Sequence, residues 1–431
     1  MPARALPPLH TGVSPSTPAE ERPDNARQRL TAAAAQLVAD GGIAAASARA
    51  IAASAGTAAS AINYNFGNIE RLLSTVFKQS VEETRAWLEH RARELNALPR
   101  SPDGAAFALL HVLDAWRRDE GRRLALTYQE AVTADPGRGV AAAWTRVWRD
   151  FWTDVARDFG LAPIDGRVLH AFFEHEALYN LSTWSPALEA LALTEMVERF
   201  AALWLDAPDR APRGAVVVAE RAAGIRPYGS VPPAAMRIAK AAALVVEDKG
   251  LTGLTHRAVA ARAGVTTGSV THHFRSIEDL VAGAIRGQVQ AMTDEAGSGA
   301  PPPVDDLVTI EGLFEALRLH VTAELPSPPV IRRRRLFLAA VRRPELAGAG
   351  AVIRFAYGGT LRDSLGRVFG LDGPELVMQA SVLARVMAAI WFACAGDEDP
   401  GASRQALFDR ITARFRVGIA ARRQDHQRSG H

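Results

Sequence analysis

The feature that most constrains this chain is an internal repeat, which organises its 431 residues. The segment Arg29–Leu73 aligns without gaps over Arg237–Val281, and about 17 of the 45 aligned positions are identical. Farther along, the tripeptide Phe-Gly-Leu at 159–161 recurs at 369–371 with two residues inserted. Self-similarity at a fixed offset is typical of repeated structural units. We therefore expect two complete units of similar fold.

Each unit is expected to begin with an amphipathic helix. Apolar residues recur at intervals of three and four over 30–38 and again over 238–246, which is the spacing of one helix face. Gly42 and Gly250 follow these segments, and glycine readily adopts the left-handed conformation that commonly ends a helix. These two glycines therefore predict where the first helix of each unit stops.

Two further short helices are expected after each of these glycines. Ser47 and Thr255 are suited to cap the second helix, because a hydroxyl group can accept a hydrogen bond from a free backbone amide. Gly56 and Gly264 then provide a tight turn into a third helix, which ends near a phenylalanine in each unit. Two short helices joined by a glycine-containing turn form a helix-turn-helix, and the preceding helix braces it.

Helical patterns also predominate in the remainder of each unit, so the chain is predicted to be all-α. A segment rich in proline and glycine separates the units, and its 28 residues could span at most about 90 Å. That length would allow the units to lie side by side. The expected divisions are a disordered leader at 1–24, a first helix-turn-helix domain at 25–73, its helical body at 74–205, a linker at 206–233, a second helix-turn-helix domain at 234–281 and its helical body at 282–423.

Composition excludes several classes of protein. The formal net charge of +3 is small for this length, so affinity for nucleic acid must come from local patches. The single cysteine, Cys394, rules out an intrachain disulfide and lies in an apolar stretch typical of buried packing. The most apolar segment, Glu375–Gly396, contains Gln379 and Arg385, which favours a core helix over a membrane span. These features are typical of a protein of the bacterial cytoplasm.

The sequence carries no motif typical of an enzyme. It has no P-loop, no glycine-rich dinucleotide motif after a strand, no HExxH and no CxxC. His272 and His273 lie in the expected third helix of the second unit without cysteines or clustered carboxylates nearby, which argues against a metal site. We therefore expect no catalytic residue, metal or cofactor. The run Arg332–Arg335 opens an expected helix, and a solvated or interdomain charge cluster is favoured there over a second nucleic-acid site.

The repeated segment resembles the DNA-binding domain of the TetR/AcrR family of transcription regulators. Gly264–Phe274 is close to the family consensus, and Gly56–Phe66 is a looser match that resembles a subgroup with the sequence INYHF. The resemblance covers about 45 residues in each unit. The remainder of each unit matches the family in length and helical character.

The chain departs from the family pattern at two positions in each unit. It has Asn63 and Thr271 where the family usually has tyrosine, and Ile69 and Ile277 where lysine is common. Both positions typically contact phosphates, so the departures weaken or redistribute the expected contacts with the DNA backbone. The expected third helix of the first unit also lacks arginine and lysine.

The resemblance implies that the third helix of each unit enters the major groove of double-stranded DNA. Asparagine can pair with adenine, and threonine can contact the thymine methyl group. Simple solvation of each polar residue is the alternative. Because the two units differ at almost every outward position, we expect an operator that is not a clean palindrome. The candidate DNA-binding residues are Ser47, Arg49, Thr57, Ser60, Asn63, Tyr64 and Asn65 in the first unit and Thr255, Arg257, Thr266, Thr267, Ser269, Thr271, His272 and His273 in the second.

In the TetR/AcrR family, the last two long helices of each protomer form a four-helix dimerisation bundle. The resemblance implies that Gly166–Thr183 and Pro186–Leu205 pack against Pro374–Ala395 and Ala402–Ala420 within one polypeptide. A monomeric chain would then act as an intramolecular pseudo-dimer, held together by the high effective concentration of its halves.

The resemblance also implies an effector pocket among the middle helices. Seven of the eight tryptophans lie in the first unit, which favours one pocket there for an apolar or aromatic small molecule. Packing of the same aromatic stripe as ordinary core is the alternative. The candidate ligand-binding residues are His111, Trp116, Trp144, Trp148, Trp152, Phe172, His175 and Tyr179.

These expectations describe a TetR/AcrR-type repressor that uses two unequal heads on an imperfect operator and is released by a small-molecule effector. The alternative is a helical ligand-binding or interaction protein whose heads no longer bind DNA.

Overall fold

The computed structural model describes residues 23–224, 231–298, 309–326, 328–369 and 373–429, and no strand occurs within these ranges. The all-α expectation is therefore confirmed for the described part of the chain. The expected leader at 1–24 lies outside it except for its last two residues, which begin the first helix.

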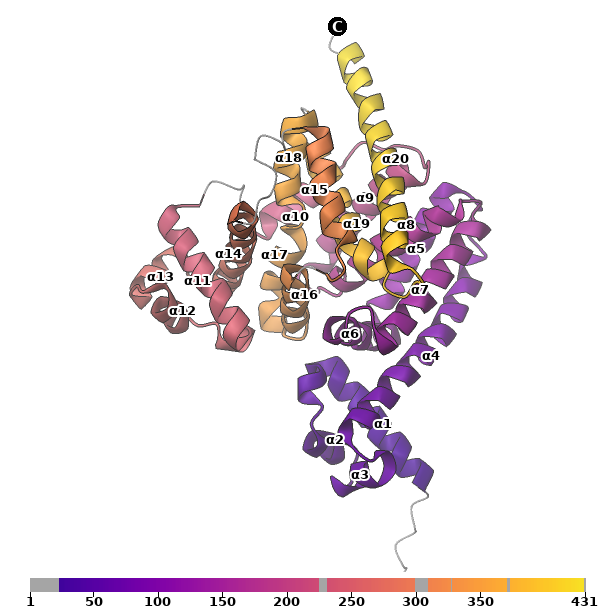
Figure 1. Cartoon of the computed structure of the whole chain (residues 1–431), viewed down its shortest axis with the longest axis vertical. Coiled ribbons are helices and arrows are strands. Elements are labelled where there is room, and N and C mark those ends of the chain that lie inside the picture. The colour runs from indigo at the N-terminus through magenta and orange to yellow at the C-terminus, as the bar shows by residue number, and fades with distance from the viewer. Residues whose placement is uncertain (1–22, 225–230, 299–308, 327, 370–372, 430–431) are drawn as a thin grey trace, which may run out of the picture.

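The first half consists of a small head and a larger helical body (Figure 1). A short 3-10 turn, η1 (Ile43–Ala45), connects the first two helices of the head. The helices of this half are α1 (Pro23–Gly41), α2 (Ala48–Ser54), α3 (Ser60–Phe66), α4 (Ile69–Leu95), α5 (Pro102–Trp116), α6 (Asp119–Ala134), α7 (Gly139–Asp158), α8 (Pro163–Tyr179) and α9 (Pro186–Trp204).

The second half follows α10 (Ala215–Ala222), a helix that lies inside the expected linker, and repeats the order of the first half except that two helices, α17 and α18, take the place of α7. Helix α10 packs against α9, α17 and α19, so this part of the connection is attached to the body. The 3-10 turn η2 (Leu251–Gly253) matches η1, and η4 (Pro344–Leu346) precedes α17. The helices are α11 (Pro233–Lys249), α12 (His256–Ala263), α13 (Thr267–His273), α14 (Ile277–Ser298), α15 (Ile310–Thr322), α16 (Pro328–Val341), α17 (Ala347–Phe355), α18 (Gly359–Phe369), α19 (Gly373–Ala393) and α20 (Pro400–Ser429).

The two heads are attached to the body differently. Helix α4 runs from the first head into the body, where it packs against α6 and α7. In the second half, α11 packs chiefly along α14. The close approach depends on Gly287, because a Cβ atom there would lie 2.3 Å from the backbone oxygen of Ala239. At the same offset the first half has Gln79, so its head lacks this close packing of helix backbones.

The two halves meet in a bundle formed by α8, α9, α19 and α20. Across the two halves, α8 packs mainly against α19, and both α8 and α9 contact α20. The contacts expected between the last two helices of each unit are therefore present. By composition alone α19 could cross a membrane, but 83% of its most apolar window is buried inside the protein. The expectation of a core helix agrees with this burial.

His170 on α8 makes the stability of this bundle sensitive to pH. Both its ring nitrogens are buried without a hydrogen-bond partner within the described structure. Burial, reinforced by the nearby Arg167, lowers the pKa of His170 to about 3. The folded protein therefore keeps His170 neutral over a range where the unfolded chain binds a proton. This single group thus makes stability fall as the pH decreases from about 6.5 towards 3.

Replacing His170 by leucine should remove this part of the pH dependence. At pH 5, His170 binds a proton in the unfolded wild-type chain but not in the folded protein. This difference lowers the free energy of unfolding by about 2 kcal/mol. We expect the stability of His170→Leu relative to wild type to rise by that amount between pH 8 and pH 5. Urea unfolding of both proteins at pH 8 and pH 5 measures their free energies of unfolding. The effect of the substitution on packing is the same at the two pH values, so it cancels when they are compared. Parallel pH profiles for the two proteins would contradict the prediction.

Candidate nucleic-acid interface

In the first head, local sequence determines which face of α3 is exposed. The Ser47 hydroxyl accepts a hydrogen bond from the backbone amide of Ala50 at 3.2 Å and caps α2. Gly56 has a φ of +64° in the turn between α2 and α3, a conformation that favours glycine. Ile62 and Phe66 on α3 are buried, so the opposite face of this helix points to solvent.

The outward face of α3 is polar and open. Ser60, Asn63 and Tyr64 are exposed, and Tyr64 keeps 83% of its surface accessible. Asn65 is half-buried, and its side-chain amide donates a hydrogen bond to the backbone oxygen of Ala61 at 2.8 Å. The face combines hydrogen-bonding groups with one large aromatic ring, which suits contact with base edges.

The second head has the same construction. The Thr255 hydroxyl accepts from the backbone amide of Ala258 at 3.1 Å and caps α12. Gly264 has a φ of +66°, and the hydroxyl of Thr266 caps α13 by accepting from the amide of Ser269 at 3.2 Å. The caps and glycine turns predicted for both heads are therefore confirmed.

Two contacts that hold α3 and α13 in place were not predicted from the sequence. Arg27 on α1 donates a hydrogen bond to the backbone oxygen of Asn65 at 2.8 Å, and its guanidinium group lies 4.5 Å from the centre of the Phe66 ring. In the second head, the Nε2 atom of His256 lies 2.8 Å from the backbone oxygen of Phe274. These pairs are separated by 38 and 18 residues, so no local pattern indicates them.

The structure leaves each candidate DNA-binding residue at least partly accessible. In each head they gather at the start of the second helix and along the third. Thr57, Asn65, Ser269 and His273 are half-buried. The exposed members are Ser47, Arg49, Ser60, Asn63, Tyr64, Thr255, Arg257, Thr266, Thr267, Thr271 and His272.

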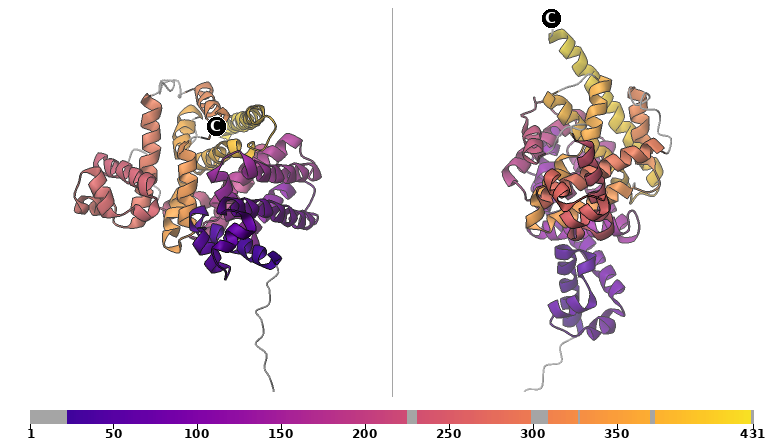
Figure 2. Two further views of the ribbon diagram at one scale, coloured as in Figure 1. Left: turned by 60° about the horizontal axis from the view of Figure 1, so that its bottom comes forward. Right: turned by 90° about the vertical axis from the view of Figure 1, so that its left-hand side faces the viewer.

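The two heads project from different sides of the body. In Figure 1 the first head, α1–α3, extends from the bottom, whereas the second head, α11–α13, lies at the left-hand side. The side view in Figure 2 agrees, with the second head facing the viewer and the first head below it. In this arrangement α3 and α13 do not form a symmetric pair on one face.

The second half holds the first head through Arg342, which follows α16. Its guanidinium group donates to the Glu130 carboxylate at 2.6 Å and to the backbone oxygens of Ala39 and Val38 at 3.0 and 3.3 Å. The other oxygen of Glu130 accepts from the backbone amide of Ile43 at 3.2 Å. The last carbonyls of a helix lack partners within that helix, so Arg342 caps α1 from the other half of the chain.

Removing this contact should loosen the first head. We expect Arg342→Ala to leave the end of α1 and the Glu130 carboxylate without their partner and to cost about 1–3 kcal/mol locally. Hydrogen exchange at the amide of Ile43 should accelerate by about 5- to 150-fold, since each 1.4 kcal/mol of opening energy is a factor of ten. The neighbouring Arg343→Ala removes the same charge and serves as the control. Equal acceleration in both variants would contradict the assigned role.

The candidate ligand-binding aromatics form a closely packed cluster in the first half. The ring of Trp148 lies with its centre 4.8 Å from that of Trp116 and 4.1 Å from that of Phe173. His175 and Tyr179 lie 4.5 Å apart by the same measure. Seven of the eight candidates are buried; the exception, His111, is exposed and lies 2.6 Å from the Glu94 carboxylate. The seven are Trp116, Trp144, Trp148, Trp152, Phe172, His175 and Tyr179.

Two cavities of the described structure lie beside this cluster. One of about 250 Å³ opens between α4 and α7, with Leu88, Val147 and Phe151 among its apolar lining residues. A second of about 700 Å³ is bounded by α4, α5 and α6 and includes His111. None of the seven buried candidates lines either of these two cavities. A pocket formed by those seven side chains therefore stays a prediction.

Comparisons with known proteins identify the same two segments as the internal repeat. Residues 30–76 and 238–284 each match the family model described as bacterial regulatory proteins, tetR family. Two solved structures are similar to part of the chain. The multidrug binding protein EbrR complexed with malachite green is 28% identical with a TM-score of 0.26, and the match covers 42% of this chain and 99% of that one. A member of the TetR family from Streptomyces coelicolor is 29% identical with a TM-score of 0.26 and the same coverage. No curated protein matches the chain.

Proposed function

Because the chain belongs to the TetR family of bacterial regulatory proteins, we propose that it is a cytoplasmic transcriptional repressor that binds DNA with both of its heads. The observation that carries the proposal is the pair of complete helix-turn-helix heads. Each has an apolar inner face that fixes the third helix and a polar outer face that is accessible. Such a helix fits the major groove with its side chains at base edges.

We further propose that one chain acts as an intramolecular pseudo-dimer. The contacts of α8 and α9 with α19 and α20 support this, because they give the bundle that two separate protomers would otherwise form. Covalent linkage keeps the halves at high effective concentration, so the pairing should persist at any dilution. The attachment of α10 to the body also shortens the free part of the connection.

The operator is expected to have unequal halves. Helix α3 carries Asn63 and Tyr64 where α13 carries Thr271 and His272, so the two heads should prefer different bases. The heads also project from different sides of the body (Figures 1 and 2). Contact with two half-sites on one duplex therefore requires a movement of at least one head or a bend in the DNA.

A small apolar or aromatic effector would release the repressor by changing the position of a head. Helix α4 is the connection best placed to respond, since it joins the first head directly to the body. The cavity between α4 and α7 contacts this helix at Leu88 and Leu95, and occupation of that cavity would act on the same element. The buried aromatic rings are closely packed, so this cluster could accept a ligand only if the rings moved apart. Close packing resists such a movement.

A gel-shift experiment with the promoter region beside the protein's own gene tests the regulator proposal. We expect a specific complex whose affinity falls steeply with salt, because phosphate contacts release counterions. Asn63→Ala and His272→Ala should each weaken binding by about 1–3 kcal/mol, which is roughly 5- to 150-fold. Gln36→Ala, on α1 and away from α3, is the control.

The variants should also affect different bases. Footprinting should show Asn63→Ala relaxing one half-site and His272→Ala relaxing the other. Two identical inverted half-sites would refute the expected asymmetry. Absence of binding at low salt would instead favour a helical interaction protein whose heads do not bind DNA.

A further inference from the structure

Six charged side chains lie fully buried where the halves meet, and their signs are sorted by half. The carboxylates belong to the first half and the guanidinium groups to the second. Each of these side chains is at most 4% exposed. We call them the core network; its members are Glu174, Glu176, Glu189, Arg334, Arg354 and Arg385.

Glu176 lies at the centre of the core network. Its carboxylate accepts from the Nε atom of Arg385 at 2.9 Å and from Arg354 at 3.4 Å. Arg354 also lies 3.6 Å from Glu189. Close by, Glu174 accepts from Arg334 at 2.7 Å. Each glutamate of the core network thus faces an arginine of the second half. Removal of either partner would leave a buried charge unpaired.

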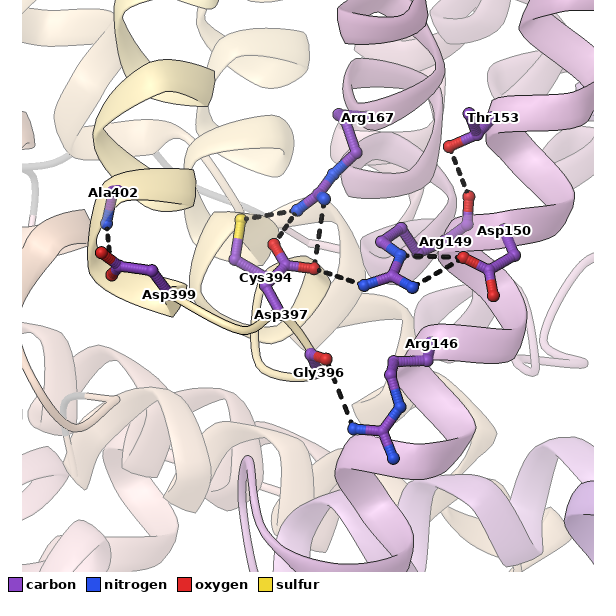
Figure 3. A network of polar contacts seen from close by, with 10 residues as sticks. All are labelled: Arg146, Arg149, Asp150, Thr153, Arg167, Cys394, Gly396, Asp397, Asp399 and Ala402. Atoms are coloured by element: carbon purple, nitrogen blue, oxygen red, sulfur yellow. Dashed lines mark hydrogen bonds and ion pairs between the residues drawn. The ribbon is translucent and has the colours of Figure 1, made fainter.

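A second buried site has the opposite arrangement of signs (Figure 3). It lies in the loop between α19 and α20, where the side chain of Asp397 is 6% exposed. Arg149 of α7 and Arg167 of α8 donate to the same carboxylate oxygen at 3.0 and 3.1 Å. We call this the loop site. Here the first half supplies the cations and the second half supplies the anion.

A second half could not satisfy these charges by pairing with another second half. The partner of Arg385 would then have to come from α19 of the other copy. The only acidic residue of α19 is Glu375 in its first turn, where it pairs with Arg199. From Leu376 to Ala393 this helix offers no carboxylate. Arg334, Arg354 and Arg385 of both copies would therefore enter the interface without the glutamates that now face them.

A first half could not satisfy its charges by self-pairing either. The loop between α8 and α9, residues 180–185, matches the loop at 394–399 that contains Asp397. Its sequence is Asn-Leu-Ser-Thr-Trp-Ser, which contains no acidic residue. Arg149 and Arg167 would therefore lose their anion, while α8 would bring Glu174 and Glu176 from both copies to one interface.

We infer that the core network and the loop site make the bundle interface selective for unlike halves. The interface of a second half accepts a first half, from the same chain or an exchanged one, and rejects a second copy of itself. Attraction to the right partner and unpaired buried charge against the wrong one act together. The inference rests on the proposed pseudo-dimer but does not depend on DNA binding, so its tests use association and stability alone.

The first test follows which halves associate. A full chain with a specific protease site after Gly224 is folded and then cleaved in two preparations. One carries an affinity tag on the second half, and the other is untagged and labelled uniformly with a heavy nitrogen isotope, so that its halves differ in mass. The two are mixed in urea below the unfolding transition, and the tagged species are captured and weighed by native mass spectrometry. We expect tagged second halves with first halves of both preparations in a 1:1 ratio. Capture of untagged second halves with tagged ones would overturn the inference.

The second test keeps the chain intact and decides the matter if the cleaved halves do not exchange. Arg334→Glu should lower the midpoint of thermal unfolding by more than 10 °C, because two carboxylates then meet. The reversed pair Glu174→Arg with Arg334→Glu should regain at least half of that loss, since these two side chains face each other at 2.7 Å. The matched single exchange Arg318→Glu, at an exposed pair within the second half, is the control. A reversed pair no more stable than Arg334→Glu alone would overturn the inference.

Discussion

Replacement of Gly287 by valine should detach the second head from α14. The new Cβ atom would lie 2.3 Å from the backbone oxygen of Ala239 and 2.6 Å from the backbone nitrogen of Lys240. Backbone atoms cannot rotate away as a side chain can, so α11 and α14 must separate. We expect a loss of at least about 3 kcal/mol in the stability of this part of the protein. Thermal unfolding should show an early transition from the second head.

The control for this prediction is Gly348→Ala on α17. Its nearest neighbour would be the Cγ atom of Glu278 at 3.7 Å, an ordinary contact. Alanine is favoured over glycine within a helix by about 1 kcal/mol, so this variant should be as stable as wild type or slightly more so. If Gly287→Val unfolded like the control, the close packing of α11 on α14 would be wrong.

Removal of the Glu176 carboxylate should have an effect of similar size on the whole protein. In Glu176→Ala, Arg385 and Arg354 keep their charges in a fully buried interface without the anion that now lies 2.9 and 3.4 Å away. Breaking a buried ion pair in this way costs about 3–5 kcal/mol. Urea unfolding of the intact chain measures the loss. Because the network joins the halves, we expect the unfolding of both to be affected.

The matching control is Glu83→Ala. Glu83 pairs with Arg123 at 2.6 Å, but both side chains are more than 20% exposed and belong to the first half. Such pairs contribute about 0–1 kcal/mol. A loss for Glu176→Ala no larger than that for Glu83→Ala would show that the buried pairing is not what stabilises the interface.

The same carboxylate predicts a distinct effect of acid. Burial alone would raise the pKa of Glu176, but the hydrogen bond from His175 and the charges of Arg385 and Arg354 lower it to about 2. A carboxylate with a depressed pKa in the folded state stabilises the protein fully above its ordinary pKa of 4.5. That contribution is lost as the pH falls from about 4.5 towards 2. The difference between wild type and Glu176→Ala should therefore shrink over this range.

Much of each head could be predicted from sequence because its signals are local. Ser47 and Thr255 cap the amides of residues three positions ahead, so the interaction lies within one helical turn. The positive φ angles of Gly42 and Gly56 are also local features, because they depend on the backbone of the turns in which these residues lie. Amphipathic spacing likewise identified the buried side of α1. These features follow from the backbone and neighbouring residues alone.

The bundle was expected from the resemblance to the TetR/AcrR family, in which the last two long helices of each protomer pair with those of the other. The sequence predicted a solvated or interdomain charge cluster at Arg332–Arg335, and Arg334 does pair with Glu174 of the other half, but the sequence did not indicate which charges are buried. Arg385 was an interruption in an apolar segment, and Arg334 was one residue in a basic run. Each is buried against a carboxylate 160 to 209 positions away in the chain. No local pattern distinguishes such an arginine from a solvated one.

The sequence by itself determined two helix-turn-helix heads, their caps and turns, and the helical units that follow them. Only the tertiary structure decided how the heads are oriented, that Arg342 of one half holds the head of the other, and that the aromatic stripe packs as a closed cluster. The physical reason is the range of the interactions. Caps and helix periodicity act over a few residues, whereas orientation and burial depend on which distant surfaces meet.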